Sequence, residues 1–289
     1  MQSSEPAGAK PLYGNVAIAL DVHRPQSARV DNYLLGGAMS FTADRELGRK
    51  IIAAFPDMPL AAWENQMFIA RAARYLAGRG LRQFLDIGTG IPLGPCLHEI
   101  VQAFAPESRV VYLDHDPIVL ATVEALTTSD PSGQVTCLRG DLAKPERILK
   151  ALAEDATLDL DRPIALALTA VLHCLPDASH PEQALKTLKA QLAPGSALML
   201  THAASDLNSK AMIQVVDACR SAGMPFHPRT REQVEAIFDG WNLVEPGVTT
   251  PARWHPVCPP STSEAAAYYA GVAVGIGTPP RDAAPGANS

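Results

Sequence analysis

Residues 84–90 have the sequence Phe84-Leu85-Asp86-Ile87-Gly88-Thr89-Gly90, in which an apolar run passes through an aspartate into a Gly-x-Gly loop. The apolar run predicts a buried strand, and glycines let the backbone turn sharply behind it and approach a ligand closely. A dinucleotide fingerprint would place its third glycine one residue before Gly94, and Pro92 removes an amide donor from the loop. We therefore expect a nucleoside cofactor site that is not built for a pyrophosphate.

Two further carboxylates follow at the ends of later predicted strands. Asp114 comes directly after an apolar run and 24 residues after Gly90, near the spacing of about 20 residues at which a carboxylate binds ribose hydroxyls. Asp141 follows a third strand, where it is suited to accept a hydrogen bond from an adenine amino group. Asp86 adds a negative charge to the loop, which suits the ammonium group of S-adenosylmethionine better than a phosphate. Together these residues favour S-adenosylmethionine over a dinucleotide.

Between residues 81 and 276 short β-rich runs alternate with helical segments, which is typical of a parallel sheet covered on both faces. Five strands are predicted at 81–87, 109–113, 134–139, 163–172 and 196–202, and two more strand-like runs at 241–249 and 266–275. Helix start signals occur at Asp116-Pro117, Ser179 to Glu182 and Thr230 to Gln233. The pattern predicts an α/β, Rossmann-like fold.

The chain divides into four predicted parts. Residues 1–25 form an N-terminal extension, and residues 26–79 look helical throughout and form a cap. Residues 80–277 form the cofactor-binding domain. Residues 278–289 are rich in Pro, Ala and Gly, and we expect them to be a disordered tail because they have little to bury.

Composition excludes several classes of protein. The 289 residues are 47% hydrophobic and 19% charged, with 24 Lys and Arg against 30 Asp and Glu. No run approaches the roughly 20 apolar residues of a membrane helix, and the N-terminus has no signal-peptide core, so we expect a cytoplasmic protein without membrane contact. The net charge of -6 argues against a nucleic-acid partner. Five separated cysteines without a Cys-x-x-Cys pair favour neither disulfides nor a metal site.

Residues 24–275 resemble the class I S-adenosylmethionine-dependent methyltransferases. They resemble more closely an actinobacterial family of predicted methyltransferases of undefined substrate. Their shared marks are Ala28 to Val30, Asn32 to Gly37, Ala43 to Arg45, Gln83 to Gly90, Asp114, Asp116 to Leu120, Ala170 to His173, Pro176-Asp177, Ala193 to Ser196, Phe238 to Gly240 and Glu245 to Val248.

The resemblance implies a seven-stranded sheet whose last strand is antiparallel, with the cofactor across the ends of the first two strands. By the same resemblance the methionine part of S-adenosylmethionine contacts Gly88 and Gly90. The implied contacts of the ribose and adenine are Asp114, His115, Asp141 and Leu142, and Tyr33 and Gly37 close the pocket from the cap.

The chain departs from that family at two places in the cap. Asp31 stands where an aromatic residue is usual, and Ala38-Met39-Ser40 replaces a polar triplet similar to Lys-Asp-Asn. Because the cap would select the substrate, these departures put the substrate contacts in question.

Candidate catalytic and substrate residues lie near the predicted strand ends. His173 follows the fourth strand and could act as a general base near neutral pH, or it could bond a neighbouring backbone group. His202 ends the fifth strand and points to the same rim, and Asn65 on the cap helix could line a substrate cavity.

The leading hypothesis is therefore an S-adenosylmethionine-dependent methyltransferase acting on an O or N atom of a small molecule. A non-catalytic protein that binds S-adenosylmethionine or S-adenosylhomocysteine remains an alternative, as does, less favoured, an NAD(P)-dependent oxidoreductase. The sequence does not distinguish the oligomeric states.

Overall fold

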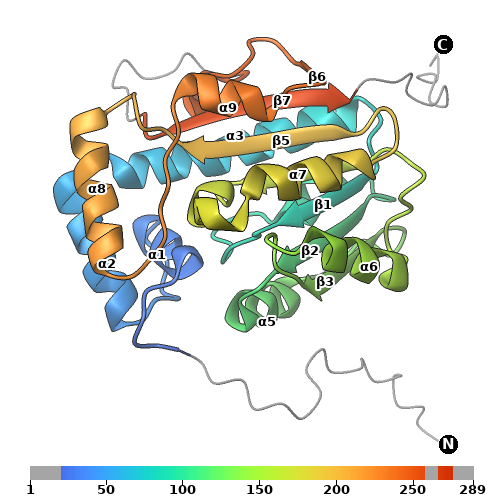
Figure 1. Ribbon diagram of the computed structural model, residues 1–289. Coiled ribbons are helices and arrows are strands. Elements are labelled where there is room, and N and C mark those ends of the chain that lie inside the picture. Colours follow the sequence, from blue (N-terminus) through green and yellow to red (C-terminus); the bar gives the residue numbers. More distant parts are fainter. Residues whose placement is uncertain (1–20, 258–265, 276–289) are drawn as a thin grey trace, which may run out of the picture.

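The computed structural model describes residues 21–257 and 266–275. A seven-stranded sheet runs through the centre in the order β3-β2-β1-β4-β5-β7-β6 (Figure 1). The strands are β1 Gln83–Ile87, β2 Arg109–Asp114, β3 Gln134–Arg139, β4 Ala165–Thr169, β5 Ala197–Ala203, β6 Trp241–Leu243 and β7 Tyr268–Gly275. The predicted tail at 278–289 lies outside the described residues.

The first five strands are parallel, and β7 is antiparallel to both of its neighbours, β5 and β6. This confirms the expected class I arrangement. Both faces of the central strands are covered, so every residue of β1 and β5 is buried. Side chains alternate between the faces, because Phe84 packs in one core while Leu85 and Ile87 pack in the other.

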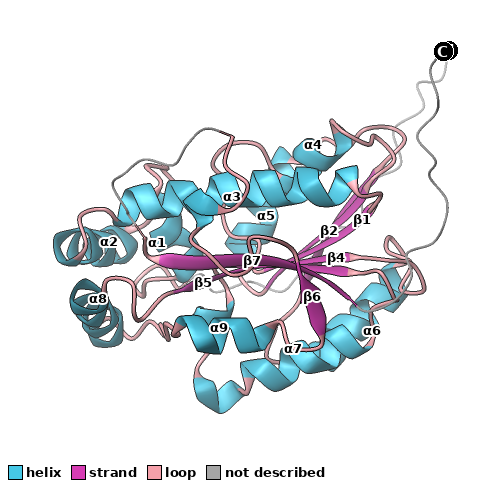
Figure 2. Cartoon of the chain, turned by 90° about the horizontal axis from the view of Figure 1, so that it is seen from above, coloured by secondary structure: helices cyan, strands magenta, loops and turns pink. Residues whose placement is uncertain are grey.

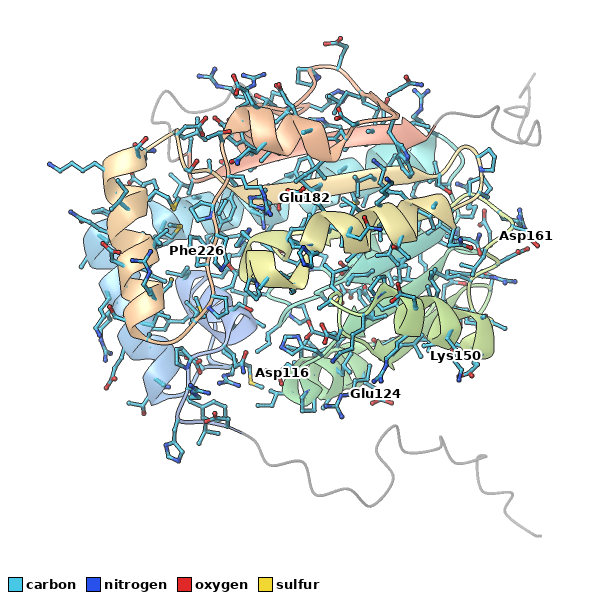
Figure 3. All side chains as sticks on the ribbon, viewed as in Figure 1. Asp116, Glu124, Lys150, Asp161, Glu182 and Phe226 are labelled. Carbon is cyan, nitrogen blue, oxygen red and sulfur yellow. The ribbon has the colours of Figure 1, made fainter. Side chains whose placement is uncertain are left out.

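Helices cover the two faces of the sheet in separate layers (Figure 2). One layer contains α3 Met58–Gly78, α4 Leu97–Gln102 and α5 Pro117–Leu126, and the other contains α6 Pro145–Asp155, α7 Pro181–Ala190 and α9 Arg231–Ile237. Charged side chains lie around the outside of the sheet and its helices, among them Glu124 on α5, Lys150 on α6 and Asp161 in the loop after α6 (Figure 3). Among the described helices, none combines the length and the apolar character that crossing a lipid bilayer requires.

Three helices form a separate group at the carboxyl edge of the parallel strands, the edge toward which β5 points (Figure 1). They are α1 Ser27–Leu34, α2 Thr42–Ala54 and α8 Ser209–Ser221. A third apolar cluster joins them to the sheet, through residues such as Leu47, Met212 and Tyr268. This group places helical side chains directly above the ends of the strands, where open α/β sheets bind their ligands.

Arg29 connects α1 to the rest of the chain. Its side chain is buried and lies 2.8 Å from the Asp44 carboxylate of α2 and 3.6 Å from that of Asp116, the N-cap residue of α5. It also donates to the backbone carbonyls of Asp21 and Arg24. One buried guanidinium therefore ties the cap to the cofactor half of the fold.

Several local predictions need correction. The fourth strand ends at Thr169, and residues Leu172–Cys174 form a short 3-10 helix instead, after a left-handed residue at Ala170. The sixth strand stops at Leu243. The capping box predicted from Ser179 is wrong, because α7 begins at Pro181 after His180, which gives no side-chain cap. The N-cap at Asp116, with Pro117 at the first helical position, and the capping box from Thr230 to Gln233 form as predicted.

Candidate functional site

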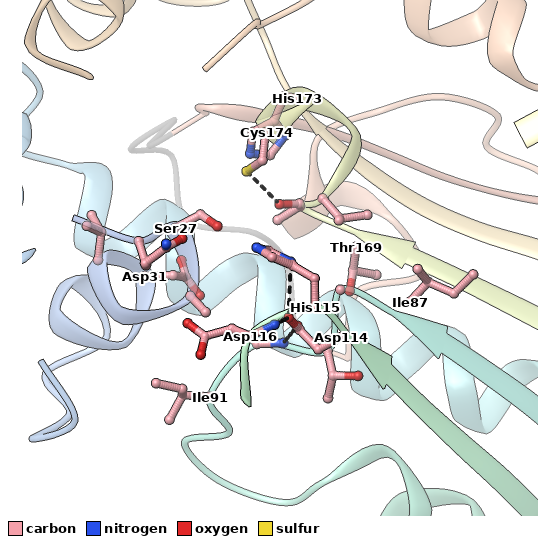
Figure 4. A pocket seen from close by; sticks show the side chains of 18 of the residues that line it. Ser27, Asp31, Ile87, Ile91, Asp114, His115, Asp116, Thr169, His173 and Cys174 are labelled. Carbon is pink, nitrogen blue, oxygen red and sulfur yellow. Dashed lines mark hydrogen bonds and ion pairs between the residues drawn. The ribbon is translucent and has the colours of Figure 1, made fainter. Parts of the chain in front are cut away.

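A cavity of about 450 Å³ lies between the carboxyl ends of β1, β2 and β4 and the helical cap (Figure 4). Its volume is within the range of about 300–1,000 Å³ that is typical of small-molecule sites. Ser27 and Asp31 of α1 face the strand ends across it. The lining includes most of the predicted cofactor residues, namely Asp86, Gly88, Gly90, Asp114, His115, Asp141 and Leu142, together with Asn65 and His173.

The glycine loop after β1 forms the floor of this cavity. Gly88 and Gly90 have φ values of +75° and +69°, which glycine adopts without strain. The Gly88 amide donates to the carbonyl of Leu113 at 2.8 Å, so the loop is tied to the end of β2. A Cβ atom on Gly88 would overlap the side chain of Val171. The close passage of two chain segments therefore requires glycine at this position.

Asp114 sits at the end of β2, directly beside that loop. Its Oδ1 accepts the backbone amide of Asp116 at 2.9 Å, and its Oδ2 lies 3.4 Å from the amide of Gly90. The hydrogen bond to Asp114 raises the pKa of His115, whose side chain is mostly exposed and 3.4 Å from the Asp114 carboxylate. These contacts orient the carboxylate at the position expected for a ribose ligand.

Two fully buried acceptors of the cavity lining, where solvent does not reach them, have no hydrogen-bond partner among the described residues. They are Oδ1 of Asp86, at the end of β1, and Oδ1 of Asn65, on α3. Burial raises the pKa of Asp86 to about 7, and the neighbouring charge of Asp114 adds to this effect. Unpaired buried acceptors are costly, and a ligand that donates to them removes that cost.

Asp141 and Leu142 follow β3 and line the same cavity. Asp141 accepts the amide of Ala143 at 3.0 Å and lies 2.9 Å from the ammonium of Lys144. Leu142 is buried beside it. The third strand thus brings a fixed carboxylate and an apolar side chain to the end of the cavity next to Asp114.

His173 lies in the cavity wall, but its geometry favours the structural interpretation over a general base. Nδ1 accepts the backbone amide of Ala203 at 3.1 Å, which leaves the ring proton of the neutral imidazole on Nε2. Burial, followed by the charges of His202 and Arg229, lowers the pKa of His173 well below its usual value. The ring therefore stays neutral and presents a donor.

His202 is not part of the cavity lining, which corrects the prediction of a substrate contact. Its ring is fully buried, with Nδ1 2.9 Å from the Ala203 carbonyl and Nε2 2.7 Å from the Arg229 guanidinium. Both ring nitrogens are used within the protein, so His202 has a structural role.

Tyr33 and Gly37 also lie outside the lining, although the family resemblance implied that they close the pocket. The Tyr33 ring packs over Gly48 of α2, and Gly37 packs against the side chain of Asn32. Both residues lie away from the cavity because α1 presents a different face to it. That face carries Ser27, Val30, Asp31 and Leu34, at the spacing i, i+3, i+4 and i+7.

Sequence reasoning missed several residues that line the cavity. Asp31 was noted only as a departure, and Phe226 and Tyr268 were not singled out. Ala170, just after β4, has a φ of +56°, which is strained for a residue with a side chain and typical of functional sites. A helical-wheel projection of α1 would have shown Asp31 within an apolar stripe. The other residues come together only in the tertiary structure.

Within residues 21–257 and 266–275, no group of three or more His, Cys, Asp or Glu side chains is arranged to hold a metal ion.

Comparisons with known proteins agree with this arrangement. The family model described as S-adenosyl methyltransferase matches residues 14–275. A DUF574 family protein from Streptomyces avermitilis is 37% identical, with a TM-score of 0.85 over 88% of this chain and 99% of that one. A candidate methyltransferase from Thermobifida fusca is 34% identical, with a TM-score of 0.81 over 89% and 97%. A search of curated proteins found no match. The chain belongs to the S-adenosyl methyltransferase family, and its cofactor is S-adenosylmethionine.

Proposed function

We propose that this methyltransferase acts on an O or N atom of a small molecule that binds between the strand ends and the helical cap. The observation that carries the proposal is the single cavity, which joins the glycine loop and Asp114 to an apolar wall from α1, α8 and β7. Cofactor and acceptor can therefore meet without crossing solvent.

The residues of the cavity fit the cofactor. Gly88 and Gly90 leave space for the methionine part, because neither has a side chain and both line the cavity. The unpartnered Oδ1 atoms of Asp86 and Asn65 are acceptors suited to the cofactor ammonium. Asp114 would accept hydrogen bonds from the ribose hydroxyls, and its two oxygens are already oriented by backbone amides.

When bound, S-adenosylmethionine supplies a methyl group on a positively charged sulfur atom. The protein's part is to align the nucleophile of the acceptor with that methyl group and to exclude water. The apolar wall from Val30, Leu34, Val215 and Phe226 excludes water, and the Nε2 proton of His173 can orient an acceptor oxygen or nitrogen. No described histidine is positioned as a general base in this proposal.

The small-molecule part of the proposal rests on charge and enclosure. The net charge of -6 and the aspartates of the cavity repel a phosphate backbone. Incubation with a metabolite extract and S-adenosylmethionine, followed by mass spectrometry, should show small molecules that gain one CH2 unit. Methylation of nucleic acid or protein alone would contradict this part.

The cofactor site is tested by isothermal titration with S-adenosylmethionine and S-adenosylhomocysteine, with NADH as the negative control. Gly88→Val should lose both ligands. Gly240→Val is the matched control, because Gly240 also has a positive φ of +77° but has open space around it and lies outside the cavity. We expect the control to bind like the wild type. NADH binding without S-adenosylhomocysteine binding, or normal binding by Gly88→Val, would contradict the proposal.

A further inference from the structure

We propose that the methyl acceptor carries a positively charged amine, and that the carboxylate of Asp31 binds it. The inference rests on the proposed function, because it concerns the acceptor half of the same cavity. It goes further by naming the chemical class of the acceptor and the residue that selects it.

Asp31 is a carboxylate placed in an otherwise apolar face. It shares the cavity side of α1 with Val30 and Leu34. Figure 4 shows Asp31 on the side of the cavity opposite the strand ends. Within the described part of the chain no hydrogen bond or ion pair reaches its side chain; its backbone carbonyl accepts the amide of Leu35 in the usual helical way. An aspartate enclosed without a partner is costly for the free protein. A cationic ligand would offset that cost.

The other carboxylates around the cavity already have partners. Asp116 lies near Arg29, and Asp141 near Lys144. Asp114 is held by backbone amides and His115, and Asp21 accepts the amides of His23 and Arg24. Among the described lining residues, Asp31 is an aspartate whose side chain accepts no hydrogen bond and forms no ion pair, and Asp86 leaves its buried Oδ1 unpaired.

These two carboxylates lie at different parts of the cavity. Asp86 ends β1 next to the glycine loop, where the cofactor ammonium is proposed to bind. Asp31 belongs to the cap and lies near Cys174 and Tyr268. Burial raises the pKa values of both groups, and the charge of Asp31 raises them further. The Cys174 thiol donates to the carbonyl of Ala170, and within the described residues neither Cys174 nor Tyr268 donates a hydrogen bond to Asp31. Asp31 is left for the acceptor.

The charge balance excludes other acceptor classes. Arg24 is the only Lys or Arg side chain among the described lining residues, against six aspartates. A carboxylate or phosphate acceptor would be repelled, and a neutral acceptor would cover the half-buried Asp31 without giving it a counter-charge. The surrounding Val30, Leu34 and Phe226 require an apolar body next to the cation. An amine on an apolar frame meets both conditions.

The test compares three small probes of the same frame: 2-phenylethylamine, 2-phenylethanol and phenylacetate. Binding is measured by titration calorimetry with the protein saturated by S-adenosylhomocysteine. The proteins are the wild type, Asp31→Asn, and Asp217→Asn as a control. Asp217 lies on α8, is mostly exposed and pairs with Arg220, so its replacement removes the same charge outside the cavity.

We expect the wild type and the control to bind the amine about tenfold or more tightly than the alcohol, because charge-assisted hydrogen bonds are the stronger kind. Phenylacetate should bind most weakly. In Asp31→Asn the preference for the amine should disappear. All three proteins should bind S-adenosylhomocysteine equally, and loss of that binding in the wild type would contradict the proposed function rather than this inference.

Three results would overturn the inference while cofactor binding is intact. The first is equal affinity of the wild type for amine and alcohol, or no detectable amine binding at millimolar concentration. The second is a preference for the amine that survives in Asp31→Asn. In the third result, Asp31→Asn binds S-adenosylmethionine more weakly than the wild type does, while its affinity for S-adenosylhomocysteine and its preference for the amine are unchanged. Asp31 would then serve the sulfonium of the cofactor.

Discussion

Replacing Asp31 by Asn should stabilise the ligand-free protein, and only above the acidic pH range. Burial raises the pKa of Asp31 from its ordinary 3.8 to about 6. Because the pKa is higher in the folded than in the unfolded state, the folded protein binds an extra proton between about pH 4 and pH 6. The free energy of unfolding of the wild type therefore falls as pH rises through that range, and the loss is complete above about pH 7.

The size of this loss follows from the two pKa values. Each pH unit of difference corresponds to about 1.4 kcal/mol, so a carboxyl moved from 3.8 to about 6 costs at most roughly 3 kcal/mol. Asp31 is partly exposed to the cavity, where solvent screens its charge. We therefore expect Asp31→Asn to be more stable than the wild type by about 1–2 kcal/mol at about pH 8.

The assay is urea unfolding of the wild type, Asp31→Asn and Asp217→Asn at several values between about pH 5 and pH 8. Cys174 and Tyr268 face Asp31 but do not ionise in this range, because burial raises the pKa of Cys174 to about 12 and that of Tyr268 further. The charge of Asp114 also acts on Cys174. The advantage of Asp31→Asn should shrink toward pH 5. A pH-independent difference, or a less stable variant at pH 8, would refute the reasoning.

Three further predictions concern separate parts of the fold. Gly88→Val should abolish binding of S-adenosylhomocysteine in calorimetry while circular dichroism shows a folded chain, because the new side chain meets Val171. Arg29→Ala should lower the free energy of unfolding by about 3–5 kcal/mol in urea titration, since it leaves Asp44 buried without its partner. His173→Ala should keep its affinity for S-adenosylhomocysteine but lose about 1–3 kcal/mol of stability, because the amide of Ala203 loses its acceptor; an unchanged melting temperature would contradict this.

The predictions made from sequence succeeded where the chemistry is local. Gly88 and Gly90 need a backbone conformation that glycine favours, and Asp114 is the last residue of its strand, so the loop and the carboxylate could both be placed from neighbouring residues alone. The strand at 134–139 was predicted at its observed bounds. The sequence predictions failed where the backbone adopts a conformation that its local sequence does not require. Ala170 adopts a left-handed conformation, which ends β4 early and turns His173 toward the amide of Ala203.

The sequence by itself determined the alternation of strands and helices, the glycine loop and the order of the carboxylates, because each depends on side-chain periodicity or backbone freedom within a few residues. The tertiary structure decided which face of α1 meets the cavity. It turned Asp31 inward and Tyr33 onto Gly48, and it directed both nitrogens of His202 into protein contacts. These outcomes depend on how α1, α2 and α8 pack over the strand ends, and contacts between segments distant in the chain are not encoded in any local pattern.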